Sequence, residues 1–437
     1  LRPHERNVQL RMTEAFLQYV WQHQLAGKQL MTTDGRKVSI VRAGDLNHDA
    51  GPDFFNARII IDDIEWVGNV EVHIHTSDWN AHRHSLDKAY NSIVLHVVYE
   101  HDKEIILENG KSPATVELKK YLEPSLLERY DTLMHNVAED EVACKDSIPD
   151  VPEFVLDSSL DRLLVERIEA KTDVVRRMLE ESRGGWEQTC YWLIARYFGG
   201  RVNALPFELL AKSVDQRLLA RWKDNPRRIE AVLMGQSGLL EGHFNDDYPR
   251  LLQNDYAAIR HGASLIPLEG HLWKFYCLRP SSFPTIRISQ FSHLLAESSN
   301  LFSTLLETGD AKKMVSIFNQ SAGDYWTTHY RFDQETSKES PKRIGVAQSV
   351  SLIINAWVPL LFEYGRQHGQ QHYKDQAIDL LHQLPAENNN ITRRWKSLGV
   401  DLSDAGRTQA LLQLYNSYCS KRRCLDCAVG YHIIKRK

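Results

Sequence analysis

Long apolar runs and cysteine residues are both scarce in this sequence. No apolar run approaches the roughly 18 residues that a membrane-spanning helix needs, and residues 1–14 lack the apolar stretch of a signal peptide. The 437 residues include six cysteines, three of them crowded near the end, which is not the pattern of a secreted disulfide framework. These absences predict a cytoplasmic protein with reduced thiols and no membrane partner.

An excess of charge of one sign is also lacking. Lys and Arg number 53 against 57 Asp and Glu, so the formal net charge is -4. Without a global basic field, a DNA or RNA partner has to be bound by a local patch. The hydrophobic share of 42% and the charged share of 25% are typical of a folded globular chain, and the length predicts two or three domains.

Strand-like alternation dominates the first part of the chain. We expect a helix over residues 14–24, then a hairpin with an Asp-Gly turn. A second hairpin follows over residues 51–75 and turns at Asp62-Asp63. A short helix, a strand and a hairpin return are expected after it. This order predicts an α+β module over residues 1–140.

Helical periodicity replaces the alternation near residue 150. The acidic segment 138–154, which contains two prolines, is the best candidate for a linker. Apolar residues then recur every three or four positions after Ser158, which predicts a long amphipathic helix with a serine cap. Further helices are expected beyond it, and no fixed-period repeat is visible. We therefore predict an all-α domain over residues 155–418 and a Cys-rich tail over residues 419–437.

The residues that carry chemistry lie in the second hairpin. A Pro-Asp pair ends at Asp53, and the run Glu71-Val72-His73 lies near the end of the hairpin. This pattern resembles the PD-(D/E)XK nuclease superfamily, over residues 11–100 and thus under a quarter of the chain. The resemblance implies a mixed sheet built from a helix, three strands, a helix and a strand. The element order expected from the sequence matches that arrangement.

The resemblance also implies a metal-dependent site for phosphodiester hydrolysis. The residues it implies are Asp53, Glu71, His73 and Lys88 for catalysis, and Asp53, Glu71, the Val72 carbonyl and Glu14 for binding Mg²⁺ or Mn²⁺. Such hard cations prefer oxygen ligands and lower the pKa of the attacking water. His73 stands where the family has a lysine, and a histidine can donate a hydrogen bond or act as a base near pH 7. Lys88, in the following helix, is a candidate to restore the ammonium group.

The convergence of the two carboxylates depends on the register of the hairpin. With a strict two-residue turn, Ile61 pairs with Ile64, and Asp53 then faces Val72 rather than Glu71. The carboxylates would lie on opposite faces of the sheet. A three-residue turn or a β-bulge restores their convergence, so we predict an irregular register between Asp53 and Glu71.

Two other interpretations of this region stay open. In the first, Glu71, His73 and His75 form the solvated face of a half-buried strand. In the second, a metal is bound by members of a concentrated set of imidazoles and carboxylates, namely His73, His75, Asp78, His82, His84 and Asp87. Such groups suit zinc, manganese or iron, and a catalytic zinc needs three protein ligands. If His75, His82 and His84 form this alternative metal site, the sequence predicts a histidine-metal hydrolase.

The tail contains a second candidate metal site. Cys419, Cys424 and Cys427 follow the spacing C-x4-C-x2-C, and His432 lies five residues further on. Three thiolates and a fourth ligand can hold zinc or an iron-sulfur cluster. Some nucleases of the superfamily bind a cluster through a cysteine triplet and one cysteine elsewhere, which makes Cys144 or Cys277 a candidate fourth ligand. The role of such a metal would be structural.

Almost the whole chain, from "GDLNHDAGPDF" to "CLDCAVG", resembles an uncharacterised bacterial family, domain of unknown function 2851. That resemblance brings no activity. Three functions remain: a nuclease of PD-(D/E)XK type, a non-catalytic protein with a degenerate nuclease fold that binds nucleic acid or protein, and a histidine-metal hydrolase. Paired arginines in the helical part suit phosphate contact, and solvated helix faces explain them equally well: Arg176, Arg177, Arg227, Arg228, Arg393 and Arg394.

Overall fold

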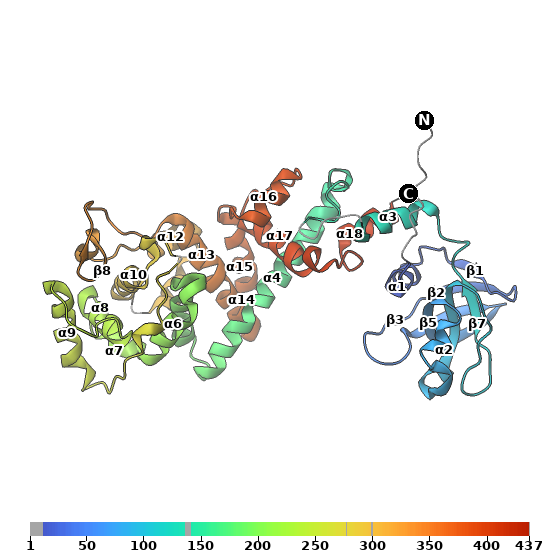
Figure 1. Cartoon of the computed structure of the whole chain (residues 1–437), viewed down its shortest axis with the longest axis horizontal. Helices are drawn as coiled ribbons and strands as arrows, with labels where there is room; N and C mark the ends of the chain where they lie inside the picture. Colours follow the sequence, from blue (N-terminus) through green and yellow to red (C-terminus); the bar gives the residue numbers. More distant parts are fainter. Residues whose placement is uncertain (1–11, 136–140, 277, 299, 437) are drawn as a thin grey trace. The chain divides into compact units, whose positions relative to one another are not determined.

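The computed structural model divides the chain into two compact units (Figure 1). It describes residues 12–135, 141–276, 278–298 and 300–436. Unit 1 comprises Leu1–Ser159 together with Leu414–Lys437, and unit 2 comprises Leu160–Gln413. Unit 1 holds a mixed sheet and unit 2 is largely helical, which confirms the expected α+β and all-α classes. The tail 419–437, which we expected as a separate segment, belongs to unit 1.

A seven-stranded mixed sheet forms the centre of unit 1 (Figure 1). Its strands are β1 (Gln29–Met31), β2 (Lys37–Arg42), β3 (Asp45–Leu46), β4 (Phe54–Ile61), β5 (Ile64–His75), β6 (Ile93–Glu100) and β7 (Ala114–Glu117). The order is β1-β2-β4-β5-β6-β7, and β3 pairs with β4. Strand β5 runs antiparallel to β4 and parallel to β6, so it is hydrogen-bonded on both sides. This central strand carries Glu71 and His73.

The connection from β5 to β6 crosses over one face of the sheet, as parallel neighbours require. It contains α2 (Asp78–Ala81) and two 3₁₀ helices, η1 (His84–Leu86) and η2 (Lys88–Ser92). Buried side chains from the crossover and from the segment after β6 form one cluster: Trp79, Tyr90, Ile93, Ile105 and Leu107. The expected hairpin return after β6 is therefore wrong. Its apolar residues fill this cluster outside any strand, and β7 pairs parallel to β6 instead.

Helix α1 (Glu14–Gln22) confirms the expected opening helix and packs against β5. The Thr13 hydroxyl caps it by accepting from the Phe16 N–H at 3.2 Å. The Phe16 ring stacks on Tyr130 of α3 (Pro124–His135), with 3.9 Å between centroids. Helix α18 (Ala428–Lys435) contacts α3 in turn, so the end of the chain completes unit 1.

The hairpin of β4 and β5 has the irregular register that the sequence predicted. Asp62 and Asp63 form the two-residue turn, both with positive φ, and Ile61 pairs with Ile64. The register then shifts between Phe54 and Ala57, so that Phe54 pairs with Val70. A β-bulge of this kind sets two residues against one and re-aims the strand. As a result, Asp53 lies opposite Glu71.

Unit 2 is built from helices with one two-stranded sheet. The elements between the two parts of unit 1 are α4 (Glu153–Glu181), α5 (Trp186–Phe198), α6 (Gly200–Ser213), α7 (Gln216–Ala220), α8 (Pro226–Gln236), α9 (Asp247–Arg260), α10 (Pro284–Glu297), α11 (Leu301–Thr308), α12 (Ala311–Phe318), β8 (His329–Arg331), β9 (Gln334–Glu335), α13 (Val346–Leu352), α14 (Val358–Gln367), α15 (Gln371–Gln383), α16 (Asn390–Ser397) and α17 (Ala405–Ser417). Helices α4 and α17 cross the boundaries between the units.

The expected linker and helix cap before unit 2 are wrong. Residues 138–140 lie outside the described residues, and the rest of the segment 138–154 contains η3 (Ile148–Asp150) and the start of α4. Helix α4 begins just after Pro152, whose carbonyl accepts from the N–H groups of Val155 and Leu156 in the first turn. Ser159 therefore lies inside the helix, where its hydroxyl donates to the Val155 carbonyl at 2.6 Å.

One helical stretch, Val346–Gln367, is long and apolar enough to cross a membrane by length and composition. It comprises α13, a π-helical turn and α14, and 72% of its apolar window is buried inside the protein. Buried apolar helices of this kind form the cores of soluble proteins, so the stretch is weak evidence for a membrane.

Several arginines of unit 2 that we considered for phosphate contact are held in ion pairs. Arg177 pairs with Glu208 at 3.0 Å, and Glu208 also accepts from Arg196 and Lys212. Arg227 pairs with Asp255 at 3.3 Å. These pairs support a structural role for the arginines involved.

Replacing Asn56, which has φ +56° at the bulge, tests the observed register. Asn56→Val should destabilise unit 1 by about 1 to 2 kcal/mol, because a β-branched residue resists the left-handed conformation. Asn56→Gly should stay within about 0.5 kcal/mol of the wild type, since glycine adopts this conformation freely. Calorimetric unfolding of the full chain measures both. Equal stability of the two variants would contradict the bulge.

Candidate metal-binding site on strand β5

A polar cavity of about 530 Å³ opens in unit 1 beside β5. Its lining residues are Glu14, Asp49, Ala50, Gly51, Asp53, Glu71, Val72, His73, His82, Arg83, His84, Asp87 and Tyr90. Five carboxylates and one guanidinium therefore face the same space. This excess of negative charge favours the binding of a cation.

Asp53 is fixed at the cavity by three hydrogen bonds from two elements. Its Oδ1 accepts from Nε2 of Gln18 in α1 at 2.9 Å, and its Oδ2 accepts from the Val72 N–H at 2.9 Å. The Asp53 N–H donates to Oε2 of Glu71 at 3.1 Å. Strand β4 begins only at Phe54, so no backbone carbonyl of β4 pairs with the Val72 N–H of β5. The side chain of Asp53 accepts this hydrogen bond instead. The two carboxylates thus converge on one cavity.

Burial and the neighbouring carboxylate of Glu71 raise the pKa of Asp53, and hydrogen bonds from Val72 and Gln18 only partly offset this. Burial also raises the pKa of Glu14, at the start of α1. A cation bound between these groups would replace the charge repulsion by attraction. Cation binding should therefore release a proton and strengthen as the pH rises.

Glu71 lies against two imidazoles. Its Oε1 is 3.3 Å from Nε2 of His84 and 3.6 Å from Nε2 of His73. The distance to His84 is that of an ion pair, but the Nε2 atom of His84 is buried without a hydrogen-bond partner among the described residues. The ligand atoms of His73, His82 and His84 all lie within 4.8 Å of one another. An unpartnered ring nitrogen in such a group is what a metal ligand requires.

A row of three histidines continues from the cavity into the sheet. His73 Nδ1 lies 2.9 Å from Nε2 of His96 on β6, and His73 Nε2 lies 3.1 Å from Nδ1 of His82. Burial lowers the pKa of His73 to about 2 and that of His96 to about 3. Both rings are therefore neutral at pH 7, which is the state that ligates metals. For Nε2 of His73 to ligate, its Nδ1–H has to donate to His96, so His96 selects the tautomer.

The structure gathers most of the site residues that the sequence suggested. Asp53, Glu71, Val72, His73 and Glu14 line the cavity together. Glu71 and His73 are only 4% and 1% exposed, so the interpretation of this row as a solvated strand face is wrong. The crossover with Trp79 covers that face, which alternation within a single strand does not reveal.

Three of the suggested residues, His75, Asp78 and Lys88, do not line the cavity. His75 lies two positions beyond His73, about 7 Å further along the strand, and its half-exposed ring is 3.6 Å from Asp78. His73 therefore takes its place beside His82 and His84. Lys88 is exposed at the start of η2 and does not line the cavity, because the crossover there is a short 3₁₀ helix rather than the expected α-helix.

Sequence reasoning missed Gln18, His96 and Tyr90. Gln18 lies one helical turn after Glu14, a spacing that could have suggested a second polar contact from α1. His96 pairs with Glu71 in the parallel ladder, and only the order of the strands reveals this. The Tyr90 ring stacks on His84 with 3.9 Å between centroids. All three orient ligand candidates.

Matches to known proteins are few. The family model described as "Protein of unknown function (DUF2851)" matches residues 14–390. The chain belongs to this family. No curated protein and no solved structure matches it. The matched range of the DUF2851 chain includes the whole cavity on β5 and ends before the cysteine triplet of the tail.

The cysteines of the DUF2851 chain gather at a second place in unit 1. Cys144, Cys419, Cys424 and Cys427 line one small cavity. The suggested ligand His432, on α18, does not line it, and Cys277 lies outside the described residues.

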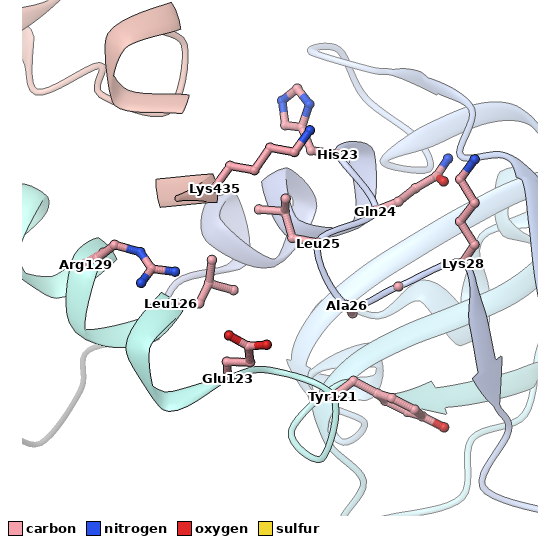
Figure 2. A pocket seen from close by; sticks show the side chains of 11 residues that line it. His23, Gln24, Leu25, Ala26, Lys28, Tyr121, Glu123, Leu126, Arg129 and Lys435 are labelled. Carbon is pink, nitrogen blue, oxygen red and sulfur yellow. The ribbon is translucent and has the colours of Figure 1, made fainter. Parts of the chain in front are cut away.

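A basic hollow of about 740 Å³ lies in unit 1 beyond the other end of α1 (Figure 2). Figure 2 shows Arg129 of α3 and Lys435 of α18 on one side of the hollow and Lys28 on the other. Glu123 is the one carboxylate in its lining. The hollow is therefore suited to anions, in contrast to the cavity on β5.

Removing a histidine tests the metal site. His84→Ala should weaken the binding of Mn²⁺ or Zn²⁺ by about tenfold or more, since even residues that only orient ligands contribute about that much. His75→Ala should bind as the wild type does, because His75 lies on the same strand outside the cavity. Isothermal titration of the metal-free protein measures both affinities. Equal losses in the two variants would rule out the proposed ligand set.

The buried neutral histidines predict a loss of stability in acid. Histidines of the unfolded chain protonate below pH of about 6.5, whereas His73 and His96 stay neutral when folded, so stability should fall as the pH falls from 7 to 5. The raised pKa of Asp53 acts in the opposite direction, so the effect is best isolated by comparing variants.

His96→Gln should reduce this acid loss by up to about 2 kcal/mol relative to the wild type. The control is His75→Gln, at a half-exposed position of the same sheet. Denaturation by urea at pH 7, 6 and 5 measures the difference. An unchanged pH dependence in His96→Gln would contradict the assignment of a neutral buried ring.

Proposed function

We propose that the cavity on β5 is the active site of a metal-dependent phosphodiesterase of PD-(D/E)XK type, which acts on nucleic acid in the cytoplasm. The observation that carries the proposal is the convergence of Asp53 and Glu71 with three histidines whose ligand atoms lie within 4.8 Å of one another. The element order of helix, antiparallel strands, crossover and parallel strand in unit 1 supports the same assignment.

The donor set favours Mn²⁺, with Zn²⁺ as a second candidate, over Mg²⁺. Glu71 and Asp53 supply carboxylate oxygens, and His73, His82 and His84 supply imidazole nitrogens. Magnesium prefers oxygen ligands alone, whereas manganese and zinc accept imidazole. When bound, such a cation supplies charge neutralisation at the phosphate and a water of lowered pKa.

The protein's own residues have separate tasks in this proposal. Glu71 faces both the carboxylate and the histidine side of the cavity, because Oε2 accepts from Asp53 and Oε1 faces His84. His96 holds the ring of His73, and Gln18 holds the carboxylate of Asp53. The family's lysine has no counterpart at position 73, since the ring of His73 is neutral. The positive charge at the phosphate then has to come from the cation.

The basic hollow supports a polymeric substrate. Helix α1 begins with Glu14 at the acidic cavity, and the residues that follow its end line the hollow with Lys28, Arg129 and Lys435. Nine helical residues span about 14 Å, which is about four nucleotides at the rise of about 3.4 Å per nucleotide in one strand of a duplex. A strand cut at the cavity can therefore place a further phosphate at the basic hollow.

A cleavage assay tests the function. Single- and double-stranded DNA and RNA are incubated with Mn²⁺, Zn²⁺ or Mg²⁺, and Glu71→Gln is compared with the wild type. We expect metal-dependent cleavage that falls on the order of 100-fold or more in the variant. Glu65→Gln is the matched control, because Glu65 lies on the same strand, exposed and paired with Arg58. It should cleave as the wild type does.

The other outcomes separate the remaining functions. A wild type that binds Mn²⁺ but cleaves no nucleic acid would replace this proposal by a histidine-metal hydrolase with another substrate. A wild type that binds nucleic acid or a protein, but binds no metal and cleaves no nucleic acid, would indicate a degenerate, non-catalytic fold. Cleavage that survives unchanged in Glu71→Gln would come from elsewhere and would remove the cavity as its source.

A further inference from the structure

Four cysteine thiols line one small cavity in unit 1. Cys144 comes from the segment before η3, and Cys419, Cys424 and Cys427 come from the segment between α17 and the start of α18. The first of these cysteines precedes unit 2 in the sequence and the other three follow it. The fold has thus brought together thiols from the two segments of unit 1 that precede and follow unit 2 in the sequence.

The thiols are close enough to act on one another. Burial and the nearby thiols of Cys427 and Cys424 raise the pKa of Cys144 to about 12. Burial and the thiols of Cys144, Cys427 and Cys424 raise the pKa of Cys419 in the same way. The described cysteines form no disulfide, so each thiol can lose its proton and ligate a metal as a thiolate. Four thiols that line one cavity can serve together as metal ligands.

The backbone around the triplet is shaped for this arrangement. The Cys427 N–H donates to the Cys424 carbonyl at 3.3 Å, which closes the C-x2-C turn. A Cβ on Gly430 would lie 2.1 Å from that carbonyl, so only glycine lets α18 approach the turn so closely. Arg422 adopts φ +53° between Cys419 and Cys424 and reverses the chain there. These turns bring the three cysteines of the tail to the lining of one cavity.

An ordinary apolar core explains the cavity less well. Its other lining residues are Leu133, Ala143, Tyr418, Arg423 and Gly430, and a space remains between them and the four thiols. Protein interiors normally pack without such gaps, because each gap costs stability. A bound metal would fill the gap and use all four sulfurs.

We propose that Cys144, Cys419, Cys424 and Cys427 bind a structural metal centre through thiolates, either a zinc ion or an iron-sulfur cluster. Each sulfur–metal bond replaces an S–H bond, and the proton goes to solvent. A tetrahedral zinc needs sulfurs about 4 Å apart. Among the described residues, only the histidine group has three ligand atoms within 4.8 Å of one another. The four sulfurs therefore lie further apart than a zinc ion needs. They would have to move closer together to bind zinc than to bind the larger iron-sulfur cluster.

Such a centre would close unit 1 where the chain leaves for unit 2 and returns from it. The segment of Cys144 leads into α4, and the triplet follows α17. Helix α18, which begins just after Cys427, contacts α3, and the Arg129 guanidinium donates to the Ile434 carbonyl at 3.0 Å. The metal would therefore hold the end of the chain in unit 1, as a cross-link between distant residues does.

Elemental analysis of the full chain tests this inference independently of the proposed function. The protein is purified without oxygen in a His84→Ala background, which removes a donor from the cavity on β5. We expect about one zinc ion per chain, or several iron atoms with acid-labile sulfide and a broad visible absorption. Cys144→Ser and Cys424→Ser should lose this metal. Cys190→Ala, in unit 2, and Cys277→Ser should keep it.

Two results would overturn the inference. One is a wild type that is purified without zinc or iron and takes up neither when it is titrated without oxygen. The other is metal loss in Cys277→Ser with retention in Cys144→Ser, which would assign the fourth ligand elsewhere. Because cysteine variants can fail to fold, the wild type is also treated with a chelator. Released metal should then accompany the exposure of four additional thiols to a thiol reagent, and release without new thiols would contradict thiolate ligation.

Discussion

Unit 1 depends on the burial of two polar side chains, Glu71 and His73, on its central strand. Strand β5 is hydrogen-bonded to β4 on one side and to β6 on the other, and the crossover covers the face that carries both side chains. A carboxylate in such a place costs several kcal/mol unless donors or cations compensate it. The Asp53 N–H supplies one donor, and the cation of the proposed function, bound between Glu71 and the imidazoles of His73 and His84, would supply the rest. The bulge, the short end of β4 and the row of histidines all serve this one requirement.

Local sequence was sufficient where local chemistry decides the structure. The Asp62-Asp63 turn fixes the start of the β4–β5 ladder, and counting residues from it to Asp53 shows that a regular ladder cannot bring the two carboxylates together. The irregular register therefore followed from this count and the expected convergence of the carboxylates, whereas the choice between a three-residue turn and a bulge did not. The sequence did not predict the partner of β6 or the start of α4. For β6, the sequence favoured a hairpin, and β7 pairs parallel to it instead. For α4, the serines at 158 and 159 indicated a helix cap as strongly as Pro152 indicated a helix start.

The candidate site was predictable along the strand but not across it. Spacing within β5 placed Glu71 and His73 on one face, and the bulge placed Asp53 opposite them. The crossover after β5 is irregular, so periodicity could not decide which of His75, His82, His84 and Lys88 turn inward. His96 and Gln18 come from elements whose positions depend on the whole sheet. The tertiary structure determines which of these residues face the cavity. The sequence shows only that histidines and carboxylates are concentrated in this region.

A neutral histidine at position 73 gives the cavity a different charge from the one that a lysine at this position would give. A lysine here would bring a permanent positive charge beside Glu71, whereas burial keeps His73 neutral. The lining then has five carboxylates against the single guanidinium of Arg83. Such a cavity repels a phosphate until a cation is present, and it holds that cation more firmly than a site with a lysine would. The imidazole of His73 is also a candidate nitrogen ligand, so in the proposed function one residue accounts both for the missing ammonium and for the preference for manganese or zinc.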